Sequence, residues 1–235
     1  MAGGWQSEVY GRSVRGAELR VHLPHDPRHL LVAGLHGEEP ETVLLARGLL
    51  GLVDAASATC AIVVCANPDG VADGTRQNAR GVDLNRNFPA ATWQAGATPS
   101  YPAGIDPVLR VPANRTNLSS TGSRPLSEPE SAELAALIER LQPALVLDLH
   151  APLELVLTTA LVPGDVAREL AEASGMELTD ELGSPVPGAL RDWLGDNGVP
   201  CVTYEVEHAG LPALYARHLP GLAAFVKRRP AASRG

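Results

Sequence analysis

Two histidines and one glutamate could together bind a metal ion. His36 and Glu39 are separated by two residues and follow an apolar run that ends at residue 35, and His150 follows a second apolar run far along the chain. Two imidazoles and one carboxylate form a ligand set of catalytic zinc sites, which leaves a fourth position for water. The pattern therefore favours a zinc site at His36, Glu39 and His150, with Asp148 as a candidate hydrogen-bond partner of a ligand.

A further acidic residue lies near the end of the apolar run 199–206, at Glu205. Ligands of open α/β sheets bind beyond the carboxyl ends of the strands. We therefore expect Glu205 to share one edge of a sheet with the metal ligands and with Asn67, which follows the run 60–66. Glu207 lies on the same face of an extended strand, so alternation alone leaves the choice between the two glutamates open.

The elements that must position these residues alternate along the chain, which predicts an α/β fold. Unbroken apolar runs are typical of strands that helices cover on both faces. A capping box of Ser127 and Glu130 predicts that one helix begins at Ser127. We expect strands at 17–23, 30–35, 60–66, 144–149 and 199–206, and further helices at 39–53, 165–174, 189–196 and 211–226.

One long stretch, from Leu84 to about residue 126, has little periodicity and much Pro, Gly, Ser and Thr. A loop of this length within a compact domain is usually functional or disordered. No linker divides the chain. We therefore expect a single domain over residues 1–235, with a long active-site loop at about 84–126.

The composition narrows the partners and the compartment. The chain has 235 residues and a net charge of −8, which argues against a nucleic-acid surface. No apolar run is long enough to predict a membrane span, and no signal peptide is readable at the first residues. Cys60, Cys65 and Cys201 are too scattered for a disulfide framework and are expected to be buried structural thiols. A reducing cytoplasm is the expected location.

Five motifs follow one another along the chain, at 36–41, 67–70, 81–89, 127–130 and 148–150, and Glu205 comes after them. In this order they resemble the zinc carboxypeptidase family. The resemblance implies a mixed, mostly parallel central sheet with helices on both faces, and one Zn²⁺ per chain in a single catalytic domain. The stretch 74–78 and the motif 81–89 are most similar to the family's branch of bacterial murein peptide amidases. That branch implies cleavage of a γ-D-glutamyl–meso-diaminopimelate bond in cell-wall recycling.

The family pattern also implies a role for each matching residue. His36, Glu39 and His150 would bind the zinc ion. Glu205 would act as the general base and then as the proton donor to the leaving amine. We favour Glu205 over Glu207 because it follows an aromatic residue and precedes an aliphatic one, as in the family.

Basic and polar residues of the long stretch and its surroundings would bind the substrate. Arg76 would polarise the scissile carbonyl, with Arg80 as a rival for that role. Asn85 and Arg86 would hold the terminal carboxylate of the substrate. The implied partner is therefore a small peptide with a free C-terminal carboxylate, while the oligomeric state stays open.

One feature departs from the family pattern. Digestive members carry a mobile tyrosine ahead of the last strand, whereas this chain has no tyrosine between Tyr101 and Tyr204. Ser184 stands near that place. Either the phenol is dispensable or another residue, such as Tyr101 or Tyr215, supplies it. The exact substrate therefore stays open.

Two other functions compete with a peptidase. An N-acyl amino acid deacylase, resembling succinylglutamate desuccinylase or aspartoacylase, also uses a His-x-x-Glu motif and a later His. The motifs Asn67–Gly70 and 83–88 favour the peptidase. A peptide-binding module without metal is the other alternative, and the presence of all three expected ligands and of Glu205 argues against it.

Overall fold

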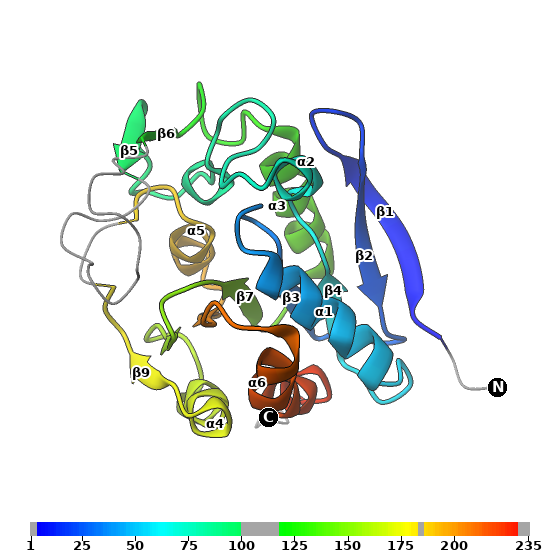
Figure 1. Cartoon of the computed structure of the whole chain (residues 1–235). Helices are drawn as coiled ribbons and strands as arrows, with labels where there is room; N and C mark the ends of the chain where they lie inside the picture. The colour runs from blue at the N-terminus through cyan, green and yellow to red at the C-terminus, as the bar shows by residue number, and fades with distance from the viewer. Residues whose placement is uncertain (1–3, 100–117, 183–185, 230–235) are drawn as a thin grey trace.

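An eight-stranded sheet runs through the part of the chain that the computed structural model describes, residues 4–99, 118–182 and 186–229 (Figure 1). The order of its strands is β1-β2-β4-β3-β7-β10-β8-β9. These strands are β1 (Gln6–Arg12), β2 (Glu18–Leu23), β3 (His29–Val32), β4 (Cys60–Val63), β7 (Val146–His150), β8 (Leu155–Leu157), β9 (Glu177–Thr179) and β10 (Cys201–Glu205). The helices are α1 (Pro40–Leu52), α2 (Pro68–Asp73), α3 (Pro129–Leu141), α4 (Gly164–Ser174), α5 (Leu190–Asp196) and α6 (Leu211–Val226).

The four central strands, β4, β3, β7 and β10, run parallel to one another. Antiparallel strands flank them, because β2 pairs with β4 on one side and β8 pairs with β10 on the other. The expected mixed, mostly parallel sheet is confirmed. Since parallel strands end at a common edge, the residues that follow β3, β7 and β10 come together.

Helices cover both faces of the sheet, with α1, α4 and α6 on one face and α3 and α5 on the other (Figure 1). Side chains of each central strand alternate between the two cores, as strand geometry requires. In β7, for example, Val146 packs with α3 and α5, whereas Leu147 packs with α1 and α6. The prediction of strands buried on both faces is confirmed.

The expected long strands and helices are present, with ends that differ by a few residues. The sequence did not predict β1, β8, β9 or α2. β1 is a half-exposed edge strand, and the other three elements are only three to six residues long. Such segments carry a weak periodic signal because few of their side chains are buried.

The capping box predicted at the start of α3 is wrong. The N-cap residue is Glu128, and no side chain caps the helix. Ser127 Oγ instead donates to Glu128 Oε1 at 2.8 Å. Glu130 accepts hydrogen bonds from Asn78 Nδ2 and from the backbone N–H of Val14, both at 3.0 Å. These partners take the side-chain groups that the capping box would have used.

The long stretch at 84–126 is more regular than expected where it is described. It begins with a 3₁₀ turn, η1 (Leu84–Arg86), and contains the antiparallel pair β5 (Ala97–Pro99) and β6 (Leu118–Ser120). Residues 100–117, between the two strands, lie outside the described residues, and so does Tyr101.

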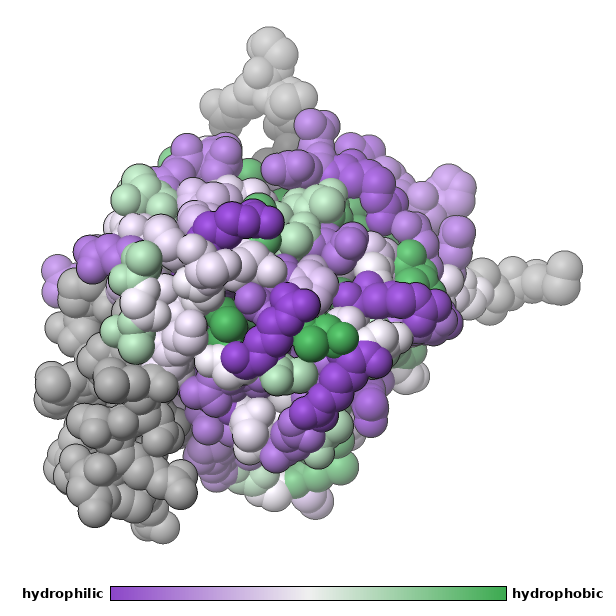
Figure 2. Space-filling model, turned by 90° about the horizontal axis from the view of Figure 1, so that it is seen from above, coloured by the Kyte–Doolittle hydropathy of each residue, from purple (hydrophilic) through white to green (hydrophobic). Residues whose placement is uncertain are grey.

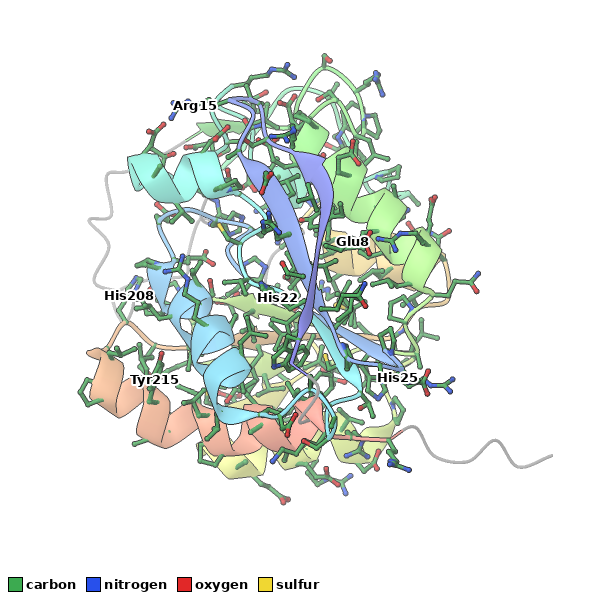
Figure 3. All side chains as sticks on the ribbon, turned by 90° about the vertical axis from the view of Figure 1, so that its right-hand side faces the viewer. Glu8, Arg15, His22, His25, His208 and Tyr215 are labelled. Carbon is green, nitrogen blue, oxygen red and sulfur yellow. The ribbon has the colours of Figure 1, made fainter. Side chains whose placement is uncertain are left out.

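The β1–β2 hairpin closes one edge of the sheet (Figure 3). Glu8 of β1 pairs with Arg140 of α3 at 2.7 Å, and Arg15 in the hairpin turn pairs with Asp73 of α2 at 2.6 Å. The hairpin therefore connects the edge of the sheet to the two helices that lie beside it.

Hydrophobic residues form only small, separate patches among hydrophilic ones on the face that Figure 2 shows. None of the helices in residues 4–99, 118–182 and 186–229 combines the length and the apolar character that a bilayer crossing requires.

Candidate active site

A His–Glu–His cluster lies at the carboxyl edge of the sheet. His36 and Glu39 come from the turn between β3 and α1, and His150 is the last residue of β7. Their ligand atoms all lie within 4.8 Å of one another, and each residue is at most 3 % exposed. The predicted meeting of these distant residues is confirmed.

The two imidazoles present their Nδ1 atoms to the carboxylate between them. His36 Nδ1 lies 2.8 Å from Glu39 Oε1, and His150 Nδ1 lies 3.1 Å from Glu39 Oε2. Each Nε2 faces a second carboxylate, Asp83 Oδ1 at 3.0 Å and Asp148 Oδ2 at 2.9 Å. A proton held on Nε2 leaves the Nδ1 lone pair free for a metal, so this donor set fits a zinc ion.

The turn that carries the first two ligands has no room for side chains at its glycines. Gly34 has φ of +64°, and a Cβ added at Gly37 would lie 1.9 Å from the carbonyl carbon of Gly70 in α2. Asn67 fixes this contact, because it accepts from the N–H of Gly70 at 2.9 Å and donates to the carbonyl of Leu35 at 3.3 Å. Asn67 thus supports the site from behind and does not line its cavity.

Asp83 is the site residue to which the sequence assigned no role. It is fully buried and is the N-cap residue of η1, where it accepts from the N–H of Asn85 at 2.9 Å. Burial alone would raise the pKa of Asp83, but Arg76 and His36 hold it well below its usual range. The available signal was its place in the motif 81–89, two residues before Asn85 and three before Arg86, the expected substrate-binding residues.

The ligands themselves are electrostatically coupled. Burial alone would raise the pKa of Glu39, but His36 and His150 hold it far below its usual range. Burial likewise would lower the pKa of His150, but Asp148 and Glu39 raise it well above its usual value. The metal-free cluster therefore favours an ionised carboxylate beside a protonated imidazole.

A cavity of about 750 Å³, partly open to solvent, lies over this cluster. Eight residues singled out from the sequence line it, and they come from five different segments. They are His36, Glu39, Arg76, Asn85, Arg86, Asp148, His150 and Glu205.

Glu205, not Glu207, faces the cavity. Glu205 is the last residue of β10 and is 8 % exposed, and the N–H of Leu153 donates to its Oε2 at 3.4 Å. Burial raises the pKa of Glu205 to about 7. Glu207 lies 2.8 Å from His218 Nε2 and 3.2 Å from Arg217 Nη1, away from the cavity.

The structure also distinguishes between the two arginines that were candidates for binding the substrate carbonyl. Arg76 Nη1 lies 3.6 Å from Glu39 Oε1, and its side chain is 11 % exposed. Arg80 is 54 % exposed, pairs with Glu128 at 3.5 Å and does not line the cavity. The geometry therefore supports Arg76 for a role at a substrate carbonyl.

Asn85 and Arg86 lie side by side on the cavity wall. Asn85 Oδ1 accepts from the N–H of Leu190 at 2.9 Å, and Asn85 Nδ2 lies 3.4 Å from His150 Nε2. Arg86 Nη1 donates to the backbone carbonyl of Asn85 at 2.8 Å, while its buried Nε has no hydrogen-bond partner. These contacts hold both side chains in place and leave a guanidinium donor available.

The idea that Tyr215 supplies a phenol to the site is wrong. Tyr215 lies beside α1, where its hydroxyl donates to the carbonyl of Leu44 at 3.0 Å (Figure 3). It does not line the cavity. The other two residues considered for this place, Ser184 and Tyr101, lie outside the described residues.

None of the three cysteines lines the cavity. Cys60 and Cys201 are buried, as expected, whereas Cys65 lies just beyond β4 and is partly exposed. Burial raises the pKa of the Cys65 thiol to about 11, which disfavours the reactive thiolate. These observations do not favour a cysteine as a nucleophile.

A buried His–Glu–His group with a glutamate and an arginine around one cavity, at the edge of such a sheet, defines a metal-dependent hydrolase. The sequence profile of the zinc carboxypeptidase family matches residues 8–197. The chain belongs to this family.

Relatives in the family include a bacterial amidase. Murein peptide amidase A of Escherichia coli (strain K12) is 34% identical over 230 residues, which cover 95% of this chain and 90% of the relative. The crystal structure of murein-tripeptide amidase from Escherichia coli O157 is similar with a TM-score of 0.86 and 33% identity, over 98% of this chain and 94% of that one. Carboxypeptidase A of Helicoverpa armigera, at 18% identity, shares the fold with a TM-score of 0.70 over 95% of this chain and 66% of its own.

Proposed function

We propose that this chain is a zinc-dependent carboxypeptidase that hydrolyses the γ-D-glutamyl–meso-diaminopimelate bond of small murein peptides. The observation that carries the proposal is that one cavity is lined both by the His36–Glu39–His150 group, which could hold a metal, and by Arg76 and Glu205. The substrate follows from the amidases of Escherichia coli, which are about one-third identical over nearly the whole chain.

The zinc ion would be held by Nδ1 of His36, Nδ1 of His150 and the carboxylate of Glu39. When bound, zinc supplies Lewis acidity toward the scissile carbonyl and toward a water molecule. Asp83 and Asp148 hold the protons on the two Nε2 atoms and so keep both imidazoles oriented.

Glu205 moves the proton in this mechanism. Its carboxylate takes a proton from the attacking water and delivers it to the leaving amine. A general base works best when its pKa is near the working pH, and burial places that of Glu205 at about 7. The Leu153 N–H holds the carboxylate at the cavity wall.

The arginines bind negative charge. Arg76 is held by Asp83 with its guanidinium toward the metal ligands, where it stabilises the charge that develops on the carbonyl oxygen. Arg86 and Asn85 bind the terminal carboxylate, for which the planar guanidinium offers two parallel donors. The substrate is thereby oriented by its free C-terminus.

The direct test is hydrolysis of L-Ala-γ-D-Glu-meso-diaminopimelate by the zinc-loaded protein, followed by chromatography of the released amino acid. We expect diaminopimelate to appear, and Glu205→Gln to prevent most of its release. Hydrolysis of N-acyl amino acids without hydrolysis of this tripeptide would instead establish the deacylase. Tight peptide binding without turnover in the zinc-loaded protein would establish a binding module.

The remaining parts of the proposal concern the whole chain. Residues 1–235 form a single catalytic domain, in which the segment around 84–126 borders the active site. The protein acts in the cytoplasm, and its three free cysteines suit that reducing compartment.

A further inference from the structure

A second arginine on the cavity wall has an unused donor. Arg191, in the first turn of α5, lines the cavity beside Val186 and Ala189. Its Nη1 is buried without a hydrogen-bond partner, and its Nη2 lies 3.4 Å from Asp192 Oδ1. Buried guanidinium groups normally have their donors satisfied, so an unpaired donor at a binding cavity indicates a missing acceptor.

An unused acceptor lies on the same cavity. Asp148 Oδ2 faces His150 Nε2, but its other oxygen, Oδ1, is buried and has no hydrogen-bond partner. Asp148 also lines the cavity and is 1 % exposed. A buried carboxylate oxygen without a partner is costly unless a ligand supplies a donor.

Both residues line the same cavity, and both influence the pKa of one buried group, the thiol of Cys201. Burial raises the pKa of the Cys201 thiol; Asp148 raises it further and Arg191 lowers it. Cys201 begins β10, and two residues later Thr203 pairs with Asp148 of β7 and also lines the cavity. Arg191 reaches this region from α5, which packs against β10.

We propose that Arg191 and Asp148 form a subsite for a zwitterionic side-chain end on the amino acid that is released, with Arg191 binding its carboxylate and Asp148 Oδ1 its ammonium group. This inference rests on the proposed function and deepens it by naming the feature of the substrate that is selected. Diaminopimelate carries such a second amino acid head at the end of an apolar methylene chain. The same cavity is also lined by the apolar side chains of Leu153, Leu182 and Val186, which suit such a methylene chain.

The test compares two tripeptides that differ in one group. L-Ala-γ-D-Glu-meso-diaminopimelate has the distal carboxylate, and L-Ala-γ-D-Glu-L-Lys has a hydrogen in its place. We expect the wild-type protein to prefer the diaminopimelate peptide by roughly 30-fold or more in kcat/KM, the scale of a buried charge pair left without one partner. Arg191→Gln should remove most of this preference by lowering kcat/KM for the diaminopimelate peptide alone, and Arg191→Lys should restore part of it.

A third substrate tests the role of Asp148 without mutating it, which would also disturb His150. A tripeptide that ends in 2-aminopimelate keeps the distal carboxylate and lacks the distal ammonium group. We expect its kcat/KM in the wild-type protein to lie between those of the other two peptides. A value equal to that of the diaminopimelate peptide would remove Asp148 from the subsite.

Controls separate the possible failures. Arg80→Gln changes an exposed arginine outside the cavity and should keep the wild-type preference. Zinc content and the thermal unfolding temperature show whether Arg191→Gln is folded and loaded. An equal loss on both peptides, or a wild-type protein without preference, would overturn the subsite and leave the proposed function standing. No cleavage of any of the three peptides by zinc-loaded protein would overturn both.

Discussion

Arg76 donates from its Nε to Asp83 Oδ2 at 2.8 Å, while the other oxygen of Asp83 lies 3.0 Å from His36 Nε2. One buried carboxylate therefore contacts both an expected zinc ligand and the guanidinium that we propose stabilises the oxyanion. A single side chain thus links the metal site to the proposed oxyanion site.

Replacing Asp83 should disturb both functions. In Asp83→Asn, the side chain can no longer act as an anionic acceptor for both neighbours. We expect zinc affinity to fall about 10-fold to 100-fold, with a further loss in kcat for the zinc-saturated enzyme. Competition with a chelating dye measures the first effect, and turnover at saturating zinc measures the second. Wild-type zinc affinity in this variant would show that Asp83 does not support the metal site.

Replacing Glu205 should separate catalysis from metal binding. Glu205→Gln keeps the shape of the side chain and removes the base, so we expect turnover to fall roughly 10²-fold to 10⁴-fold with one zinc ion still bound. Glu207→Gln is the matched control, because Glu207 pairs with His218 and Arg217 outside the cavity. If only Glu207→Gln loses activity, Glu207 is the general base and the assignment to Glu205 is wrong.

The raised pKa of Glu205 also predicts how the stability of the metal-free protein depends on pH. Burial raises the pKa of Glu205 from 4.5 to about 7, so the folded chain favours the protonated acid. The protonated Glu205 therefore contributes its full stabilisation of the folded chain below about pH 4.5, and this contribution is lost as the pH rises through about 7. Glu205→Gln does not titrate and should therefore gain stability relative to the wild type at high pH, by at most about 3 kcal/mol.

Urea unfolding in the presence of a chelator, at pH 5 and at pH 8, measures this effect. The difference in the free energy of unfolding between variant and wild type should be larger at pH 8. A difference that is the same at both pH values would show that Glu205 does not carry the raised pKa.

Removing Arg86 should affect substrates with a free C-terminus most. We expect Arg86→Ala to lower kcat/KM for the free tripeptide roughly 30-fold or more, since a buried carboxylate–guanidinium pair is lost. The C-terminally amidated peptide, already a poor substrate, should lose much less. Equal losses on the two peptides would contradict the assignment of Arg86 as the carboxylate anchor.

The sequence predicted the metal ligands and Glu205 because their positions depend on a simple rule. Each lies at or just after the end of a buried apolar strand, and parallel strands end at a common edge. The choice between Arg76 and Arg80 followed no such rule. Both lie in an irregular segment, and only the buried carboxylate of Asp83 shows which of them turns inward.

Tertiary partners also explain the wrong expectations. Ser127 and Glu130 have the spacing of a capping box, but Ser127 bonds to Glu128 and to Asn87, and Glu130 bonds to Asn78 and Val14. The unused atoms of Asp148 and Arg191 could not be predicted either, since hydrogen-bond satisfaction is a property of the folded cavity. A linear pattern carries information about neighbours along the chain, and these contacts join residues far apart in it.

The contact between Gly37 and Gly70 limits how this metal site can vary. Even a methyl group at residue 37 would overlap the backbone of α2, at 1.9 Å from a carbonyl carbon. To make room, the turn that carries His36 and Glu39 or the backbone of α2 at Gly70 would have to shift. The geometry of the metal ligands thus depends on the missing side chain at Gly37, and a substitution by alanine, which adds only one carbon and two hydrogens and touches no ligand, would disturb it.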